Sequence, residues 1–172
     1  MSSKLTPVGR VSFPNVFEAK AIGDNSEKLF TVDIIFDADT DLSELEAAIE
    51  ASVAEKWPKG KPKNWQSPIK DGDDKEDAPE YAGMKYLSLK AKEDRQPTVV
   101  DRDKSIITRE SGKFYGGCYA RVSYNVYSWT YLGKNGTSVG LKNIQKTADG
   151  TPLGGGRTTA DEDFDEFDEA AF

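Results

Sequence analysis

Aromatic and polar side chains alternate with small, mostly apolar ones between Gly116 and Tyr131. Successive side chains of an extended strand point to opposite faces. One predicted face holds Cys118, Ala120, Val122, Tyr124, Val126 and Ser128. The other holds Tyr119, Arg121, Ser123, Asn125, Tyr127, Trp129 and Tyr131. The first set suits a core. Flat rings beside a guanidinium suit a surface on which bases stack and phosphates are held.

Two alternatives stay open for this strand. Tyrosine, tryptophan and threonine are good strand formers, and half-exposed tyrosines commonly cover sheets without binding anything. The assignment of faces also assumes that no second bulge lies between Gly117 and Tyr131, because a slip of one residue would exchange the two sets.

A second candidate lies in residues 56–70, where lysines at 56, 59, 61 and 63 are interleaved with Trp57 and Trp65. A lysine every two or three residues can follow a phosphate backbone, and indole faces accept bases of any identity. Alternatively, this is a solvated loop whose tryptophans pack onto the body, and Trp57 could continue the apolar face of a preceding helix. We expect Trp65, more than Trp57, to contact a ligand.

The predicted nucleic-acid contacts fall into two groups. Residues expected to stack or clamp are Trp65, Tyr115, Tyr119, Arg121, Tyr127 and Trp129. Residues expected to hold phosphates are Lys59, Lys61, Lys63, Arg102 and Lys113.

The last twelve residues, 161–172, contain seven carboxylates, three phenylalanines and no basic residue. Because the chain has 30 acidic and 23 basic residues, the net charge of −7 lies entirely in this tail. Such a block is expected to be solvated and mobile, and to compete with nucleic acid for a cationic groove. Its expected partner-binding residues are Asp161, Glu162, Asp163, Phe164, Asp165, Glu166, Phe167, Asp168, Glu169 and Phe172. A plain solubility tail is the alternative, but it would gain nothing from the phenyl rings.

The chain contains no histidine, and Cys118 is its single cysteine. These counts exclude an intramolecular disulfide, the usual zinc sites and any triad that uses a histidine base. Asp71-Gly-Asp-Asp lacks the later glutamate of a calcium loop, and Gly154–Gly156 lacks the lysine of a phosphate loop. We therefore expect a binding protein that is not an enzyme and has no cofactor or metal. With no signal peptide or membrane span, it is expected inside the cell.

The elements that must position these residues are mostly strands. Strands are expected at Val8–Phe13, ending at Pro14, at Leu29–Phe36, at Lys85–Ala91, at Pro97–Val100 and at Gly116–Tyr131. In the second of these, Phe30, Val32, Ile34 and Phe36 share a face, and Thr31 and Asp33 point the other way. A turn is expected at 133–136. Residues 138–146 fit either a short helix or a closing strand.

One helix is expected before Pro58, with Leu42, Leu45, Ile49 and Val53 on one side and a capping box formed by Asp41 and Glu44. A long polar loop follows, at 56–80. The fold class is therefore mainly β, an OB-like five-stranded barrel with one covering helix. Residues 1–150 form the predicted OB domain, 151–160 a flexible Gly-rich linker and 161–172 the tail.

Four motifs carry a resemblance that spans nearly the whole chain. They are Gly9-Arg-Val-Ser-Phe-Pro14, Ile69-Lys-Asp-Gly72, Pro97-Thr-Val-Val-Asp101 and Tyr115-Gly-Gly-Cys-Tyr-Ala-Arg-Val122. In this order, with a Gly-rich approach to an acidic end, they resemble the tailed-phage single-stranded-DNA-binding proteins. The resemblance implies an OB fold, sequence-tolerant binding of single strands and a role in phage DNA replication or recombination. Relatives' tails end in acids and a terminal Phe; here Ala170-Ala171 separates the acids from Phe172.

The sequence thus predicts a protein that binds and protects single-stranded DNA in the cytoplasm of an infected bacterial host. Its tail would recruit replication proteins such as a polymerase or helicase. No membrane partner is expected, and a homodimer is left open. One alternative is an acidic DNA mimic or inhibitor that binds a host protein, although its carboxylates would be expected on the folded body. Another is a structural virion component.

Overall fold

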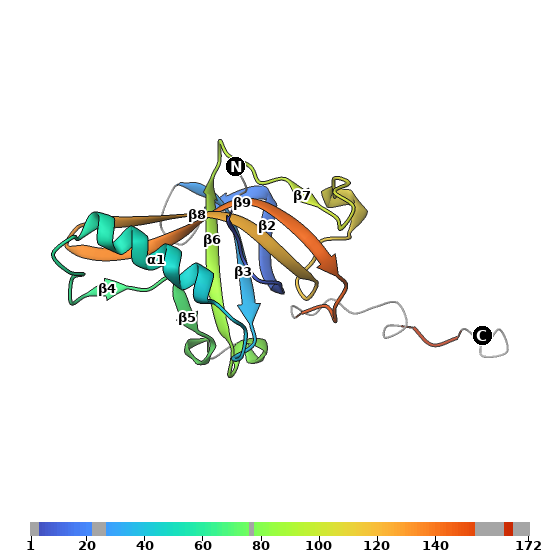
Figure 1. The fold of residues 1–172 in the computed structure, drawn as a ribbon. Coiled ribbons are helices and arrows are strands. Elements are labelled where there is room, and N and C mark those ends of the chain that lie inside the picture. The colour runs from blue at the N-terminus through green and yellow to red at the C-terminus, as the bar shows by residue number, and fades with distance from the viewer. Residues whose placement is uncertain (1–3, 22–26, 76–77, 154–163, 167–172) are drawn as a thin grey trace.

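A computed structural model describes residues 4–21, 27–75, 78–153 and 164–166 (Figure 1). The strands are β1 (Lys4–Leu5), β2 (Gly9–Ala21), β3 (Lys28–Phe36), β4 (Trp65–Gln66), β5 (Ile69–Asp71), β6 (Lys85–Lys92), β7 (Val99–Val100), β8 (Tyr119–Tyr131) and β9 (Lys134–Ala148). Helix α1 spans Ser43–Lys56, and short 3-10 turns occupy Gly72–Asp74, Pro79–Tyr81 and Arg109–Ser111. Within the described ranges, no helix is long and apolar enough to cross a membrane.

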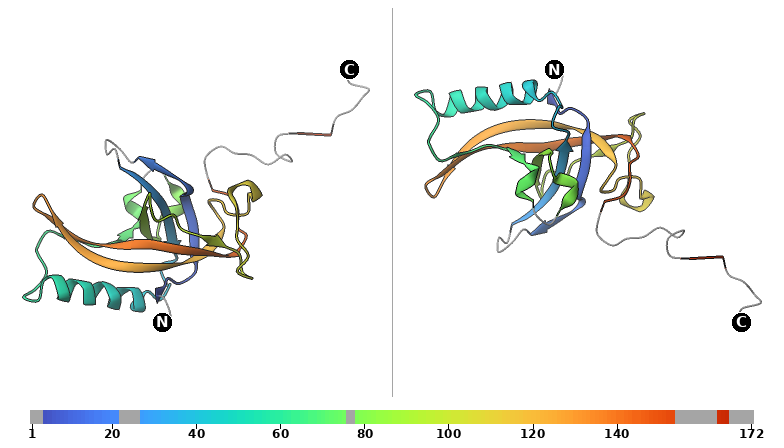
Figure 2. Two further views of the ribbon diagram at one scale, coloured as in Figure 1. Left: turned by 90° about the horizontal axis from the view of Figure 1, so that it is seen from above. Right: turned by 90° about the horizontal axis from the view of Figure 1, so that it is seen from below.

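Five strands form a ring. β2 pairs antiparallel with β3, β3 with β6, and β8 with both β9 and β2, while β6 meets β9 in parallel through the pair Lys90 and Gly140. The mainly β, OB-like prediction is confirmed, and residues 138–146 belong to strand β9 rather than to a helix. β8 and β9 are the longest pair, and their hairpin extends beyond the ring beside α1 (Figures 1 and 2).

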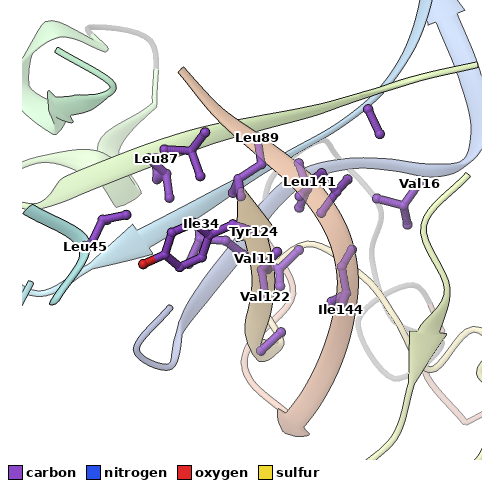
Figure 3. Close-up of a cluster of buried hydrophobic side chains, with 14 of the residues drawn as sticks. Val11, Val16, Ile34, Leu45, Leu87, Leu89, Val122, Tyr124, Leu141 and Ile144 are labelled. Carbon is purple, nitrogen blue, oxygen red and sulfur yellow. The ribbon is translucent and has the colours of Figure 1, made fainter. Parts of the chain in front are cut away.

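The core fills the ring with the inward side chains of its five strands (Figure 3). These are, among others, Val11 and Val16 of β2, Ile34 of β3, Leu87 and Leu89 of β6, Val122 and Tyr124 of β8, and Leu141 and Ile144 of β9. Along β8 the predicted alternation is confirmed, because Ala120, Val122 and Tyr124 are buried and Tyr119, Arg121 and Asn125 are exposed. The pairing of β8 with β9 has two register shifts, and in both the extra residue, Thr147 or Lys142, belongs to β9. The alternation along β8 is therefore uninterrupted, and its two faces are not exchanged.

Helix α1 buries Leu45, Ile49 and Val53, as its spacing predicts. The predicted capping box is wrong: Leu42 is the N-cap and no side chain caps the helix. The Asp41 carboxylate instead accepts a hydrogen bond from the amide of Ser43, 3.0 Å away, which forms a local turn before the helix.

Strand β2 continues past Pro14, where the sequence predicts that it ends. Proline lacks an amide donor, and the register against β3 shifts between Ser12 and Asn15, so a bulge accommodates it. At this bulge Phe13 has a positive φ of 46°.

A segment that carries Lys75, Ala78 and Tyr81 packs over the outer side of β3 and β6. Ile35, Ala78, Tyr81 and Tyr86 form a second apolar cluster there. Asp33, expected to point away from the core, is 8% exposed, because this segment covers it. The Asp33 carboxylate accepts hydrogen bonds from Tyr81 (2.6 Å) and Ser88 (2.7 Å), so its burial is compensated.

Candidate nucleic-acid interface

The outer face of β8 presents a row of exposed rings. Tyr119, Tyr127 and Tyr131 are 38%, 46% and 70% exposed. Trp129 is half-buried, and its indole nitrogen donates a hydrogen bond of 2.8 Å to Ser138 Oγ on β9. The predicted stacking residues of β8 therefore share one accessible face of the hairpin.

Small residues of β9 lie opposite this row. Gly136, Ser138 and Gly140 pair with Trp129, Tyr127 and Asn125 respectively. A Cβ atom on Gly136 would lie 2.6 Å from the indole carbon Cζ2 of Trp129, so the ring lies over bare backbone.

At its other end, β8 leads into a basic trough. We use this name for three adjoining hollows of about 600, 350 and 180 Å³. Their walls include the cations Arg102, Lys104, Lys113, Arg121 and Lys146, with Asp101 and Asp149 as the carboxylates. The first two hollows share Arg102, and the second and third share Arg121 and Gln145, so the three lie next to one another on the surface.

Gln145 organises the centre of the basic trough. Its amide oxygen accepts a hydrogen bond of 2.8 Å from Arg121 Nε, and its amide nitrogen donates to the carbonyls of Asp101 (3.4 Å) and Arg102 (3.3 Å). This arrangement brings the Arg102 loop beside Arg121. In the part of the chain that the structure describes, Arg102, Lys104 and Arg121 form no ion pair. Their charges are therefore available to a bound anion.

Within the basic trough, Lys146 and Asp149 form an ion pair. Lys146, 7% exposed, donates a hydrogen bond of 2.6 Å to Asp149 Oδ1. Burial of the ammonium alone would lower the pKa of Lys146, but the hydrogen bond and charge of Asp149 outweigh it and the pKa is raised. The hydrogen bond from Lys146 likewise lowers the pKa of Asp149. Sequence reasoning missed Lys146, because it could not place residues 138–146 on a strand.

Tyr115 lines the trough but is anchored. Its hydroxyl accepts a hydrogen bond from the Gly150 amide (3.1 Å), and two acceptors for its own proton lie near it, the Gly150 carbonyl oxygen (3.0 Å) and Asp149 Oδ1 (3.2 Å). Lys113 also lines the trough and lies 4.0 Å from Asp101 Oδ2.

The structure places Trp65 away from this surface. Its indole nitrogen donates a hydrogen bond of 2.9 Å to Thr137 Oγ1, and Thr137 in turn lies 2.8 Å from the hydroxyl of Ser128. Because Thr137 and Ser138 point to opposite faces of β9, Trp65 and Trp129 lie on opposite sides of the hairpin. Ser52 of α1 extends the chain of hydroxyls by a further 2.8 Å bond to Ser128.

Lys59, Lys61 and Lys63 are exposed residues of the segment that joins α1 to Trp65. The ammonium of Lys61 lies 4.2 Å from the centre of the Trp65 ring. Trp65 also lines a cavity of about 550 Å³ under α1, whose walls carry Glu46, Glu50, Asp71 and Asp73 against Lys70 and Lys85. Because these walls carry more carboxylates than lysines, they are unfavourable for phosphate. The predicted contacts therefore fall into two groups in space: those on β8 and in the basic trough, and those around Trp65. Trp57 packs half-buried against the core.

Within the tail, the structure describes Phe164–Glu166, all exposed, with Phe164 at 74%. The other predicted partner-binding residues, Asp161, Glu162, Asp163, Phe167, Asp168, Glu169 and Phe172, lie outside the described residues. Before the gap, Leu153 packs against the cluster around Tyr81, and its amide donates to the Gly116 carbonyl, 2.8 Å away. Residues 149–153 therefore run from the basic trough to this cluster. The division into domain, linker and tail stays a prediction.

The strand order, the parallel contact of β6 with β9 and the covering helix define an OB-like β protein. Residues 3–171 match the model of a family described as "Enterobacter phage Enc34, ssDNA-binding protein", and the chain belongs to this family. It is 34% identical over 177 residues to "Putative protein p50" of Acyrthosiphon pisum secondary endosymbiont phage 1, covering 96% of this chain and 94% of that protein.

Solved structures show the same fold. The single-stranded DNA-binding protein of bacteriophage Enc34 in complex with ssDNA matches with a TM-score of 0.74 and 22% identity, covering 87% of this chain and 88% of that one. Its C-terminal truncation matches with a TM-score of 0.69, 22% identity and 87% of each chain. The gp2.5 single-stranded DNA-binding protein of bacteriophage T7 matches with a TM-score of 0.59 and 15% identity, covering 92% of this chain and 98% of that one.

Proposed function

We propose that this protein binds and protects single-stranded DNA during phage DNA replication or recombination, in the cytoplasm of the infected bacterial host. The observation that carries the proposal is one continuous surface. Exposed rings on the outer face of β8 lie beside the basic trough, where Arg102, Lys104 and Arg121 form no ion pair with any residue that the structure describes. Membership of the family supports the same ligand.

Each part of this surface has a separate role in binding. Tyr119, Tyr127 and Trp129 would stack on bases, whereas Arg102 and Arg121 would hold the phosphate backbone. Every base has a π-face, so stacking contributes affinity without selecting a sequence, at about 1–3 kcal/mol per base. Phosphate contacts add affinity that falls with salt. Coating of this kind requires no catalytic group.

The tail would act as a competitor and a docking segment. Asp149 lines the trough and Leu153 is the last residue described before the tail, so the polyanion is tethered beside the cations. Eleven further residues reach Phe164, and an extended chain spans at most about 3.3–3.6 Å per residue, so the tether can reach the whole trough. A bound strand would displace the tail and free its phenylalanines for replication proteins such as a polymerase or helicase.

Titration of the purified chain with fluorescent oligonucleotides tests the proposal. Oligo-dT and a mixed-sequence single strand should bind with similar affinity and quench tryptophan emission, and a duplex of equal length should bind more weakly. Absence of any complex with unpaired strands in dilute buffer would refute it. The DNA-mimic alternative is not favoured, since the matching family is described as ssDNA-binding and the cations of the basic trough outnumber its carboxylates. Sedimentation of the same material would test homodimer formation.

A further inference from the structure

The turn that joins β8 to β9 carries the most exposed large apolar side chain in the part of the chain that the structure describes. Leu132 is 83% exposed, and Tyr131 beside it is 70% exposed. Leu132 and Gly133 form a two-residue turn with φ angles of 49° and 78°. Such turns favour Asn or Gly, and a left-handed conformation is rare for a bulky side chain. Because residues held in this way cluster at functional sites, Leu132 is a candidate for a role beyond reversing the chain.

The tip of the hairpin, which we define as Tyr131–Lys134, is a fixed projection that is both apolar and cationic. The hairpin that carries it extends beyond the ring (Figure 1). Asn64 Nδ2 donates a hydrogen bond of 3.0 Å to the Gly133 carbonyl, and Asn135 Nδ2 donates one of 2.9 Å to Asn64 Oδ1. These bonds hold the tip, so it is not free to fold back onto its own chain. Lys134 is exposed and forms no ion pair with any described residue.

The cavity of about 550 Å³ under α1 has the complementary character. Its walls combine the apolar side chains of Ile49, Trp65, Ile69 and Met84 with Glu46, Glu50, Asp71 and Asp73, against Lys70 and Lys85. Asp71 and Asp73 accept hydrogen bonds from backbone amides. Glu46 and Glu50 are exposed on α1, and within the described ranges neither forms an ion pair. Ligand pockets typically measure about 300–1,000 Å³, so this cavity has room for a large side chain.

We infer that the tip of one copy of this protein inserts into the cavity under α1 of a second copy. Leu132 would contact the apolar walls, and Lys134 would pair with Glu46 or Glu50. The acidic tail is a poor occupant, because the seven carboxylates of residues 161–172 would face further carboxylates in the cavity.

The tip and the cavity are different surfaces of one chain, so the contact is heterologous and repeats head to tail in a row of copies. If each copy binds single-stranded DNA as proposed above, a row would place consecutive copies on one strand and make coating cooperative. That consequence rests on the proposed function, whereas the contact itself does not.

Sedimentation velocity of the full chain without DNA, over a range of concentrations at low salt, tests the contact. The wild type should associate, and Lys134→Glu should weaken association at least fivefold. Glu46→Lys with Glu50→Lys should weaken it equally, and all three changes in one chain should restore it. Lys20→Glu, the same change of charge at the exposed end of β2, is the matched control and should associate like the wild type.

A mixing experiment tests the head-to-tail arrangement. Leu132→Gly removes the apolar side chain, and glycine adopts positive φ without strain, so this variant should stay folded, which thermal unfolding checks. This variant and the Glu46→Lys, Glu50→Lys variant should each be monomeric. Their equimolar mixture should form a one-to-one dimer and no larger species, because one intact tip and one intact cavity remain. A mixture that stays monomeric would overturn the inference.

Disulfide trapping detects the contact even when it is weak. A Leu132→Cys chain mixed with a Ser67→Cys chain should form a linked heterodimer under mild oxidation, since Ser67 lines the cavity and the native Cys118 is buried. Ile106→Cys, at another exposed apolar position (71%), should link to Ser67→Cys much less. Equal linking by both would overturn the inference and leave the proposed function intact. Failure to bind single strands would overturn the proposed function and leave the contact standing.

Discussion

Trp129 and Ser138 are joined across the β8–β9 hairpin by a hydrogen bond of 2.8 Å from the indole nitrogen to the hydroxyl. The bond occupies the polar edge of the indole, and Gly136 leaves room beneath the ring. The ring is therefore fixed before any ligand arrives, so little side-chain entropy remains to be lost on binding.

Trp129→Ala should weaken binding of unrelated oligonucleotides alike, by about 1–3 kcal/mol, or roughly 5- to 150-fold. The reason is that stacking does not depend on base identity. Anisotropy titrations with oligo-dT and with mixed-sequence strands measure the loss. A loss confined to one sequence, or none, would remove Trp129 from the site.

Trp65→Phe should act mainly on stability. The change removes the donor to Thr137 and leaves a buried hydroxyl with one partner fewer, which should lower the free energy of unfolding by about 1 kcal/mol. Denaturant unfolding measures this. Trp65→Ala in the oligonucleotide titration tests the sequence-based expectation of ligand contact, and a loss equal to that of Trp129→Ala would support it.

Arg121→Gln should reduce the salt dependence of DNA binding. Removing one phosphate contact lowers the slope of log affinity against log salt by about 1. Arg95→Gln, an equal change of charge at an exposed turn after β6, is the matched control and should leave the slope unchanged. Equal slopes for both variants would place the phosphate contacts outside the basic trough.

Tyr81→Phe should make the protein less stable and less sensitive to alkali. Burial and the hydrogen bond to Asp33 raise the pKa of Tyr81. A raised pKa stabilises the fold below the unfolded-state value of about 10, and this contribution is lost as pH rises further. The wild type should therefore lose stability above that pH. The variant should lose less, as thermal unfolding at a series of pH values would show, and parallel curves would contradict this assignment.

Deleting residues 161–172 should tighten DNA binding most at low salt, because an anionic tether competes best when charges are least screened. The affinities of full-length and shortened chains should converge as salt rises. Identical affinities at every salt concentration would exclude competition by the tail.

The period-two pattern of β8 predicts its two faces because neither register shift places an extra residue on that strand. The partner strand was harder to predict, since Gly136, Gly140 and the extra residues Lys142 and Thr147 interrupt its alternation. The side of the hairpin that Trp65 occupies depends on the edge pairing of β4 with β9, a tertiary contact that loop composition does not encode. The burial of Asp33 likewise depends on a distant segment that carries Tyr81.

Gly136 has a consequence for how variants of this protein would behave. A methyl group at this position would occupy the space beneath the indole and tilt Trp129 off the strand, even though the residue itself offers nothing for a polynucleotide to grip. A substitution that adds one carbon atom can thus weaken binding at a residue that does not itself contact the ligand.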